Sequence, residues 1–260
     1  MNKKLNIWQG KFISWIIPFV VFIIWIGWGL TSGADKGLLP TPLQVWLSFV
    51  RLIENGTLAQ NLAISTVRAF KGLAWGGVIG FILGVLNGIS RKADKILNIP
   101  IQMIRNVPYL AMMPLILVWF GIGEATKTIL IAIGTFFPIY LDTYHGIRYI
   151  DPNLIEMANV YGIKNKDLYV NVIFPGALPS IMIGIKQSLG RMWVILIVAE
   201  EIASKSGIGF MVTNAREYML MDVIVLGLIL YAILGSLSDI VTTKIERKLL
   251  KWRYSTERVK

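Results

Sequence analysis

Long runs of apolar residues, separated by short polar segments, dominate the chain. Three of these runs contain no charged residue over eighteen or nineteen positions: Phe12–Leu30, Gly72–Ser90 and Asn106–Gly123. A helix that crosses a membrane needs about twenty predominantly apolar residues. The pattern predicts an all-α polytopic membrane protein with six transmembrane helices, over residues 12–30, 68–89, 99–121, 127–146, 180–202 and 222–243.

Proline residues and polar residues modify this pattern. Pro108 and Pro114 are expected to break the third predicted span, because proline lacks the backbone donor that a helix interior uses. A short amphipathic helix is expected near residues 42–53. Residues 204–221 are expected to form a polar connection between the fifth and sixth spans.

The first apolar run follows Lys3, Lys4 and Lys11, and therefore resembles a secretory signal peptide. A possible cleavage site lies at Ser32-Gly33-Ala34. The run is longer than the core of a signal peptide, which has about 7–15 residues. We therefore expect a retained first span with the N-terminus in the cytoplasm.

The composition and the charge distribution favour a membrane protein. The chain is 55% hydrophobic and 16% charged, whereas soluble domains contain about 25% charged residues. The net charge of +11 alone could indicate a nucleic-acid partner. However, the predicted cytoplasmic segments carry sixteen Lys and Arg residues and the external segments five, which follows the positive-inside rule. Both termini (N-in/C-in) and residues 151–179 are therefore expected in the cytoplasm, and no nucleic-acid partner is expected.

Residues 151–179 carry signals for a helical loop. Asp151 can cap a helix, and Pro152 suits the first helical position. Gly162 can adopt the left-handed conformation that ends a helix, so a helix is predicted over 152–161. Ala158 and Gly162 are four residues apart, and we expect them to present a small-residue face to a partner. A second helix, over 165–173, is expected to end before Pro175.

Residues 156–175 resemble the EAA loop of the membrane subunits of bacterial ABC importers. In that family the loop runs Glu-Ala-Ala, three residues, Gly, nine residues, Ile, one residue and Leu-Pro. Every spacing is kept here, with apolar replacements at three positions: Glu156-Met157-Ala158, Gly162, Val172 and Phe174-Pro175. The resemblance implies a coupling loop that contacts an ATPase subunit. Its expected contact residues are Glu156, Met157, Ala158, Tyr161, Gly162 and Pro175.

Further stretches resemble the nitrate/sulfonate/taurine branch of these permeases, and the aliphatic-sulfonate permeases above all. They are Gln102–Pro108, Val118–Gly121, Gly134–Tyr140, His145–Arg148, Phe174–Ser180, Ser206–Gly209 and Asn214–Glu217. The resemblance implies the transmembrane domain of a type I ABC importer. Its expected parts are an N-terminal tail, first span and external segment (1–59), a core (60–246) and a basic cytoplasmic tail (247–260).

The same resemblance implies a multi-pass permease subunit in the bacterial cytoplasmic membrane. Two copies of the chain would form the pathway for a small anionic solute, with aliphatic sulfonates expected and taurine, nitrate or a vitamin precursor as alternatives. Two copies of a separate ATPase subunit would use ATP and Mg on the cytoplasmic side, and an external binding protein would deliver the solute. This chain is itself expected to hold no cofactor.

Catalytic chemistry has little support in the sequence. There is no cysteine, and His145 is the single histidine, too few for a histidine metal cluster. Gly121–Thr128 nearly matches a P-loop, but Thr126 replaces its second glycine and no strand precedes it. Glu200 and Glu201 point about 100° apart on a helix, and we expect them to mark the outer end of the fifth span. An enzyme is not expected, and a secondary transporter driven by an ion gradient is the main alternative.

Glycines and basic residues inside the predicted spans are candidates for helix packing and for transport. Glycines recur every four residues at Gly72, Gly76, Gly80, Gly84 and Gly88. Small residues let membrane helices approach closely, so this face is expected to pack within the subunit, with a pore or dimer contact as the alternative. A charge in a membrane costs about 2.5–3.5 kcal/mol on insertion scales. Arg105 with Asn106, and Arg191, are therefore candidates for helping an anion cross, with structural ion pairs as the alternative.

Overall fold

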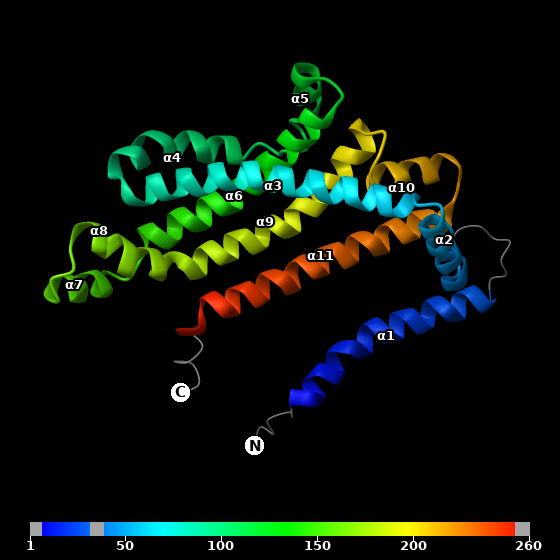
Figure 1. Ribbon diagram of the computed structural model, residues 1–260, viewed down its shortest axis with the longest axis horizontal. Helices are drawn as coiled ribbons and strands as arrows, with labels where there is room; N and C mark the ends of the chain where they lie inside the picture. Colours follow the sequence, from blue (N-terminus) through cyan, green and yellow to red (C-terminus); the bar gives the residue numbers. More distant parts are fainter. Residues whose placement is uncertain (1–6, 32–38, 253–260) are drawn as a thin grey trace.

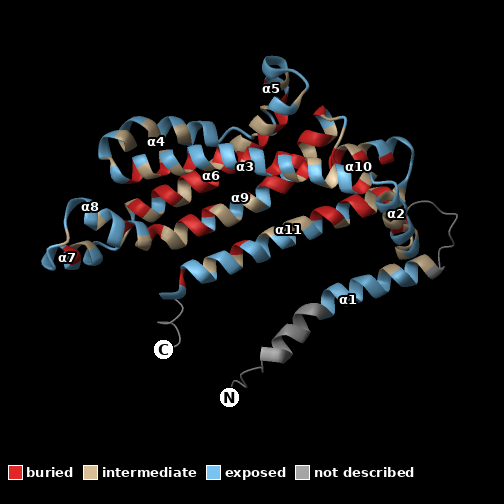
Figure 2. Cartoon of the chain, in the orientation of Figure 1, coloured by how far each residue is buried: buried red, intermediate tan, exposed pale blue. Residues whose placement is uncertain are grey.

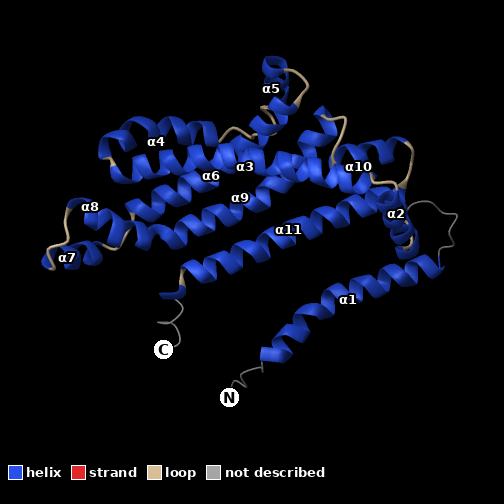
Figure 3. Ribbon diagram, in the orientation of Figure 1, coloured by secondary structure: helices blue, strands red, loops and turns tan. Residues whose placement is uncertain are grey.

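Every regular element in the described part of the chain is a helix, so the expected all-α fold is confirmed (Figure 1, Figure 3). The computed structural model describes residues 7–31 and 39–252. Lys3, Lys4, the possible cleavage site at 32–34 and the last part of the basic tail lie outside these residues. The elements are α1 (Ile7–Thr31), α2 (Pro42–Glu54), α3 (Thr57–Ile89), α4 (Arg91–Arg105), α5 (Met113–Phe120), α6 (Glu124–Arg148), α7 (Pro152–Val160), α8 (Asn165–Leu168), the π-helical turn η1 (Tyr169–Ile173), α9 (Phe174–Ala203), α10 (Ile208–Glu217) and α11 (Met221–Leu249).

Four helices in the described residues are long and apolar enough to cross a membrane. They are α3, α6, α11 and the continuous helix Asn165–Ala203, of which α9 is the main part. These helices contain the predicted second, fourth, fifth and sixth spans. The first predicted span falls within α1, whose described apolar part is shorter, at Ile16–Gly29.

The third predicted span consists of two helices joined by turns. α4 ends at Arg105 and α5 begins at Met113, with residues 106–112 between them. The expected break at Pro108 is therefore confirmed. The expected break at Pro114 is wrong, because this proline lies in the first turn of α5, where its missing N–H replaces no helical hydrogen bond.

The glycine face of α3 packs directly against α6. Each glycine lies beside a residue about 59 positions later, in the pairs Gly72–Ile131, Gly76–Thr135, Gly84–Thr143 and Gly88–Ile147. This constant offset means that the two helices run parallel and in register. A Cβ atom added at Gly80 would stand 2.6 Å from the Phe136 carbonyl oxygen, so the two backbones touch where the glycines lie.

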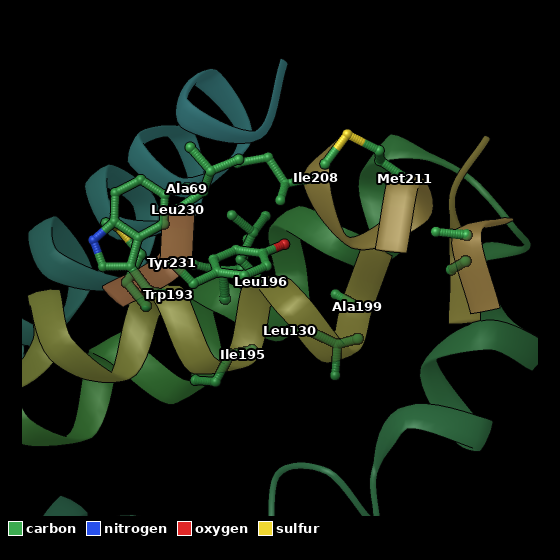
Figure 4. Packing of buried hydrophobic residues seen from close by; sticks show 14 of the residues in the cluster. Ala69, Leu130, Trp193, Ile195, Leu196, Ala199, Ile208, Met211, Leu230 and Tyr231 are labelled. Atoms are coloured by element: carbon green, nitrogen blue, oxygen red, sulfur yellow. The ribbon is translucent and has the colours of Figure 1, made fainter. Parts of the chain in front are cut away.

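The core continues on the other side of α6, where α9 runs antiparallel to it. Gly134 of α6 faces Ile195, and Gly184 of α9 faces the Pro138 carbonyl. α10 and α11 pack against α9 in turn. Figure 4 shows Trp193, Leu196 and Tyr231 in this cluster of buried apolar side chains, which lies in the half of the bundle away from α7.

The outward faces of these helices are apolar as well. Trp75 on α3 is 65% exposed, and Leu228 and Ile233 on α11 are also exposed. Figure 2 shows many exposed residues along α11 and α3. Helices that are apolar on all sides suit a hydrocarbon environment, in agreement with the predicted membrane protein.

Candidate functional site

The loop after α6 begins with a short capped helix. The Asp151 carboxylate accepts a hydrogen bond from the backbone N–H of Asn153 at 2.9 Å, and Pro152 begins α7. Gly162 ends the helix with a φ angle of +78°. The backbone N–H groups of Gly162 and Ile163 donate to the carbonyls of Asn159 and Ala158, as in a Schellman motif. The predicted helix 152–161 and both of its boundary signals are confirmed.

The second helix of the loop does not end before Pro175. α8, η1 and α9 form one uninterrupted helix from Asn165 to Ala203. Pro175 lies in the first turn of α9, directly after the π-helical turn Tyr169–Ile173. The prediction was wrong because a wider π turn beside the proline lets the chain remain helical, with the irregularity confined to one turn.

The two faces of α7 differ sharply. Ala158 is only 3% exposed and faces the bundle side of the loop, where α7 packs against η1. The expectation that Ala158 and Gly162 together face a partner is therefore wrong for Ala158. Gly162 has open space where a Cβ atom would be, and Glu156 is exposed. Met157 is 53% exposed and Tyr161 is 78% exposed.

α7 also carries an exposed apolar surface. Its residues are Leu154, Met157, Val160 and Tyr161, which we call the α7 apolar surface. Figure 1 shows α7 and α8 together at one end of the molecule, with α2 and α10 at the opposite end. Exposed apolar patches on proteins commonly mark contact sites for another protein.

The candidate transport residues lie on separate helices. Arg105 and Asn106 are exposed at the end of α4, which packs along α3. Arg191 is exposed on α9, beside Gly190, which has open space around it. One turn before Arg191, Gln187 donates a hydrogen bond to Asp142 of α6 at 3.2 Å. α9 therefore carries a polar stretch in its middle. The principal contacts between helices do not bring α4, which carries Arg105, against this stretch.

Lys186 differs from Arg191 in its surroundings. Its ammonium group forms an ion pair with Asp239 of α11 at 3.0 Å and reaches Thr243 at 3.3 Å. Lys186 thus joins α9 to α11. Its ion pair supplies a local counter-charge, in place of the membrane surface that a long side chain can otherwise reach.

A buried charge cluster at the other end of the bundle was not predicted. Arg68 of α3 is 4% exposed and Glu200 of α9 is 0% exposed, and their side chains form an ion pair at 2.9 Å. Arg68 also binds Glu124 of α6 at 2.8 Å through Nε. Lys127, which is 3% exposed, donates to the same Glu124 at 2.7 Å and to Ser204 at 3.3 Å. The cluster thus joins α3, α6 and α9.

The same cluster caps the first turn of α10. The backbone N–H groups of three successive residues, Gly207, Ile208 and Gly209, donate to Asn61, Ser65 and Glu200 at 2.7, 2.8 and 2.9 Å. Ser65 in turn donates to both oxygens of Glu200 at 2.8 Å. The donors that a helix leaves unpaired at its start are thus satisfied by side chains of α3 and α9.

Glu200 and Glu201 therefore have different environments, as their angular separation on a helix predicts. Glu201 pairs with the exposed Arg216 of α10 at 3.4 Å, at the surface. Both residues lie in the last turn of α9, at the expected end of the fifth span, and Glu200 also takes part in the buried cluster. The sequence did hold a signal, because Arg68 and Glu200 have opposite charges and lie at the outer ends of predicted spans. Choosing the partner, however, requires knowing which helices are neighbours.

The lysine of the near match to a P-loop, Lys127, takes part in this cluster. Lys127 lies in the first turn of α6 and is held by Glu124 and Ser204, and a helix, α5, precedes the segment. Within the described residues, no group of three or more His, Asp or Glu side chains could hold a metal ion. His145 lies against the rings of Tyr144 and Tyr149 at the end of α6.

Comparison with known proteins identifies the family. Residues 76–251 match the family described as the inner membrane component of binding-protein-dependent transport systems. The chain belongs to this family. It is 46% identical to the putative aliphatic sulfonates transport permease protein SsuC of Escherichia coli (strain K12), over 97% of this chain and 96% of that protein. It is 41% identical to the SsuC protein of Bacillus subtilis (strain 168), over 93% and 88% of the two chains.

The fold of this inner membrane component also has a solved relative. A chain from inward-facing conformations of the MetNI methionine ABC transporter superposes with a TM-score of 0.61, over 71% of this chain and 92% of that chain, at 20% identity. The expected importer fold and the expected permease, as opposed to an enzyme, are confirmed. The family assignment also excludes a secondary transporter, because the chain's relatives are permeases of binding-protein-dependent systems.

Proposed function

We propose that this chain is the permease subunit of an ATP-driven importer of aliphatic sulfonates. The observation that carries the proposal is the α7 apolar surface, presented on a capped helix within a segment that has the spacing of an EAA loop. Such a surface on a short loop gains no stability for the isolated chain, because burying apolar groups requires a partner. We propose that the partner is an ATPase subunit.

The proposed topology has six spans with both termini in the cytoplasm. α1 forms the first span, and α4 and α5 together form the third. The broken third span is acceptable in a membrane only where its free backbone groups face protein or a water-filled cavity. We therefore propose that residues 105–112 face the pathway, with Arg105 and Asn106 at its wall. The excess of Lys and Arg in the assigned inner segments supports this orientation.

The proposed assembly contains two copies of this chain, two ATPase subunits that use ATP and Mg, and an external solute-binding protein. α3 and α6 pack along their glycine face inside one subunit, so this face is already occupied. The contact between two permease copies is therefore proposed to use other faces of the bundle. The exposed apolar side chains of α3, α5 and α11 offer candidates.

The proposed solute is an aliphatic sulfonate that, unlike taurine, carries no amino group. The likeness to SsuC proteins supports this choice, and taurine and nitrate are the alternatives to test. Arg191, exposed beside Gly190 on α9, supplies a positive charge at membrane depth. Guanidinium groups form paired hydrogen bonds with two oxygens of a planar or tetrahedral oxyanion, and a sulfonate offers three oxygens for such a pair.

Reconstitution tests this function. The chain is co-expressed with the ATPase subunit from the same gene cluster, and the complex is placed in liposomes with the purified binding protein. We expect ATP-dependent uptake of radiolabelled ethanesulfonate. An excess of unlabelled ethanesulfonate should reduce this uptake more than the same concentration of taurine or nitrate does. Uptake that needs no ATPase subunit, or that taurine or nitrate suppresses better, would overturn the proposal.

A further inference from the structure

The buried charge cluster lies at one end of a single long helix whose other end is the coupling loop. The helix Asn165–Ala203 contains 39 residues, which at 1.5 Å per residue is about 58 Å. Its first turns pack against α7 through η1, and its last turn carries Glu200. One continuous helix thus connects the loop to Glu200.

Glu200 binds three elements beyond this helix, of which α11 contributes the Tyr231 hydroxyl at 3.5 Å. It accepts hydrogen bonds from Ser65 and Arg68 of α3, and from the backbone N–H of Gly209 at the start of α10. The side chain is fully buried, so water does not compete for these bonds. Buried charge-assisted hydrogen bonds are short and directional, which makes them suited to transmitting a displacement.

The turn before α10 is shaped around this carboxylate. Gly207 has a φ angle of +108°, and a Cβ atom there would stand 2.5 Å from the Glu200 Cδ atom. A Cβ atom at Gly209 would stand 2.6 Å from the Glu200 Cβ atom. Arg68 also donates to the carbonyl and to the hydroxyl of Ser206 in the same turn. Residues 204–209 are therefore fitted closely to Glu200 and Arg68, and they lead directly into α10.

We infer that Glu200 is a positioning residue. It links the helix Asn165–Ala203, and through it the coupling loop, to α10. Resting on the proposed function, this inference makes α10 and the α10–α11 turn the part of the permease that responds to the ATPase. Conversely, a binding protein that contacts this outer end would be sensed by the ATPase through Glu200. Coupling between two sites is reciprocal, so loss of the link affects both directions.

The chain offers a matched control one residue away. Glu200→Gln removes the charge of a buried residue that joins the four helices α3, α9, α10 and α11. Glu201→Gln makes the same chemical change in a residue whose single ion pair, with Arg216, lies at the surface. Ser65→Ala is a milder second variant, because it removes the hydroxyl between Glu200 and Ile208 and changes no charge.

The test measures ATP hydrolysis by the complete complex in liposomes, with and without binding protein loaded with ethanesulfonate. For Glu200→Gln we expect basal hydrolysis close to the unmodified rate and stimulation by the loaded binding protein reduced at least about fivefold. Ser65→Ala is expected to reduce stimulation by about two- to fivefold. Glu201→Gln is expected to retain full stimulation. A purely structural role of Glu200 would lower basal and stimulated hydrolysis together.

Such a joint loss would overturn the inference, and so would three other outcomes. They are full stimulation in Glu200→Gln, equal losses in Glu200→Gln and Glu201→Gln, and, if Glu200→Gln fails to assemble, full stimulation in Ser65→Ala. Failure of the proposed function is recognised separately, because the unmodified complex would then show no uptake of ethanesulfonate driven by ATP.

Discussion

At the scale of single residues, missing side chains decide how α3 meets α6. The carbonyl of Phe136 and the side chain of Thr143 occupy the space that side chains at Gly80 and Gly84 would need. In a membrane, helices gain little from apolar burial, since lipid is apolar as well, and close van der Waals contact takes its place. Glycine is therefore required on this face for packing, while its flexibility is not used there.

Gly80→Ala is expected to lower the free energy of unfolding by about 1–3 kcal/mol, because the added methyl group meets backbone atoms that cannot rotate away. The matched control is Gly235→Ala on α11, where no atom lies within 4 Å of the added Cβ. There the change is expected to be neutral or stabilising by up to about 1 kcal/mol, because alanine favours helix. Thermal unfolding of both variants in the same detergent measures the difference. Equal destabilisation would contradict the packing account.

Arg191 is the second residue whose role can be separated by substitution. Arg191→Gln is expected to reduce the initial rate of ethanesulfonate uptake about tenfold, the loss expected for one hydrogen bond to a charged group. Arg105→Gln is expected to act in the same direction. Lys186→Gln serves as control, because Lys186 already pairs with Asp239 of the neighbouring α11. Equal uptake by all three variants, at equal protein levels in the membrane, would remove the arginines from the pathway.

At the scale of elements, α7 combines a strict stop with an exposed apolar side. Its end depends on Gly162, whose φ angle of +78° is disfavoured for residues with a side chain. Its proposed docking face depends on residues such as Met157 and Tyr161, which are exposed in the isolated chain. Local sequence signals predicted the helix bounds, because caps and stops act over a few residues. They did not predict which side Ala158 faces, since that depends on packing against η1.

Gly162→Val is expected to abolish uptake while ATP hydrolysis continues, because a β-branched residue cannot adopt the left-handed conformation and the end of α7 must shift. Gly162→Asn is the matched variant, since asparagine tolerates that conformation, and it is expected to retain most of the coupling. The ratio of ethanesulfonate transported to ATP hydrolysed, measured in liposomes, reports on this. If both variants uncouple equally, the size of the side chain in the ATPase contact matters and the backbone conformation does not.

At the scale of the whole molecule, the sequence predicted four spans well, because apolar runs of that length are typical of transmembrane helices. It predicted the break at Pro108 because proline acts locally. The pairing of Arg68 with Glu200 could not be predicted. The two residues are 132 positions apart, and the sequence does not show that their helices, α3 and α9, are neighbours. Both ends of the bundle are therefore organised by polar residues, one end by a local loop and the other by a tertiary cluster.

This two-ended arrangement predicts the accessibility of two exposed tyrosines. Tyr161 at the end of α7 is 78% exposed, and Tyr218 after α10 is 69% exposed. The chain has no cysteine, so Tyr161→Cys and Tyr218→Cys each introduce a single reactive thiol. With the proposed topology, a membrane-impermeant maleimide added to cells with a permeable outer envelope is expected to label Cys at 218 but not at 161. Opening the inner membrane of cells that lack the ATPase subunit should then make both positions labelled, because in those cells only the bilayer protects the loop. Labelling at 161 in sealed cells would place the coupling loop outside, where no ATP is available, and would exclude an ATPase partner.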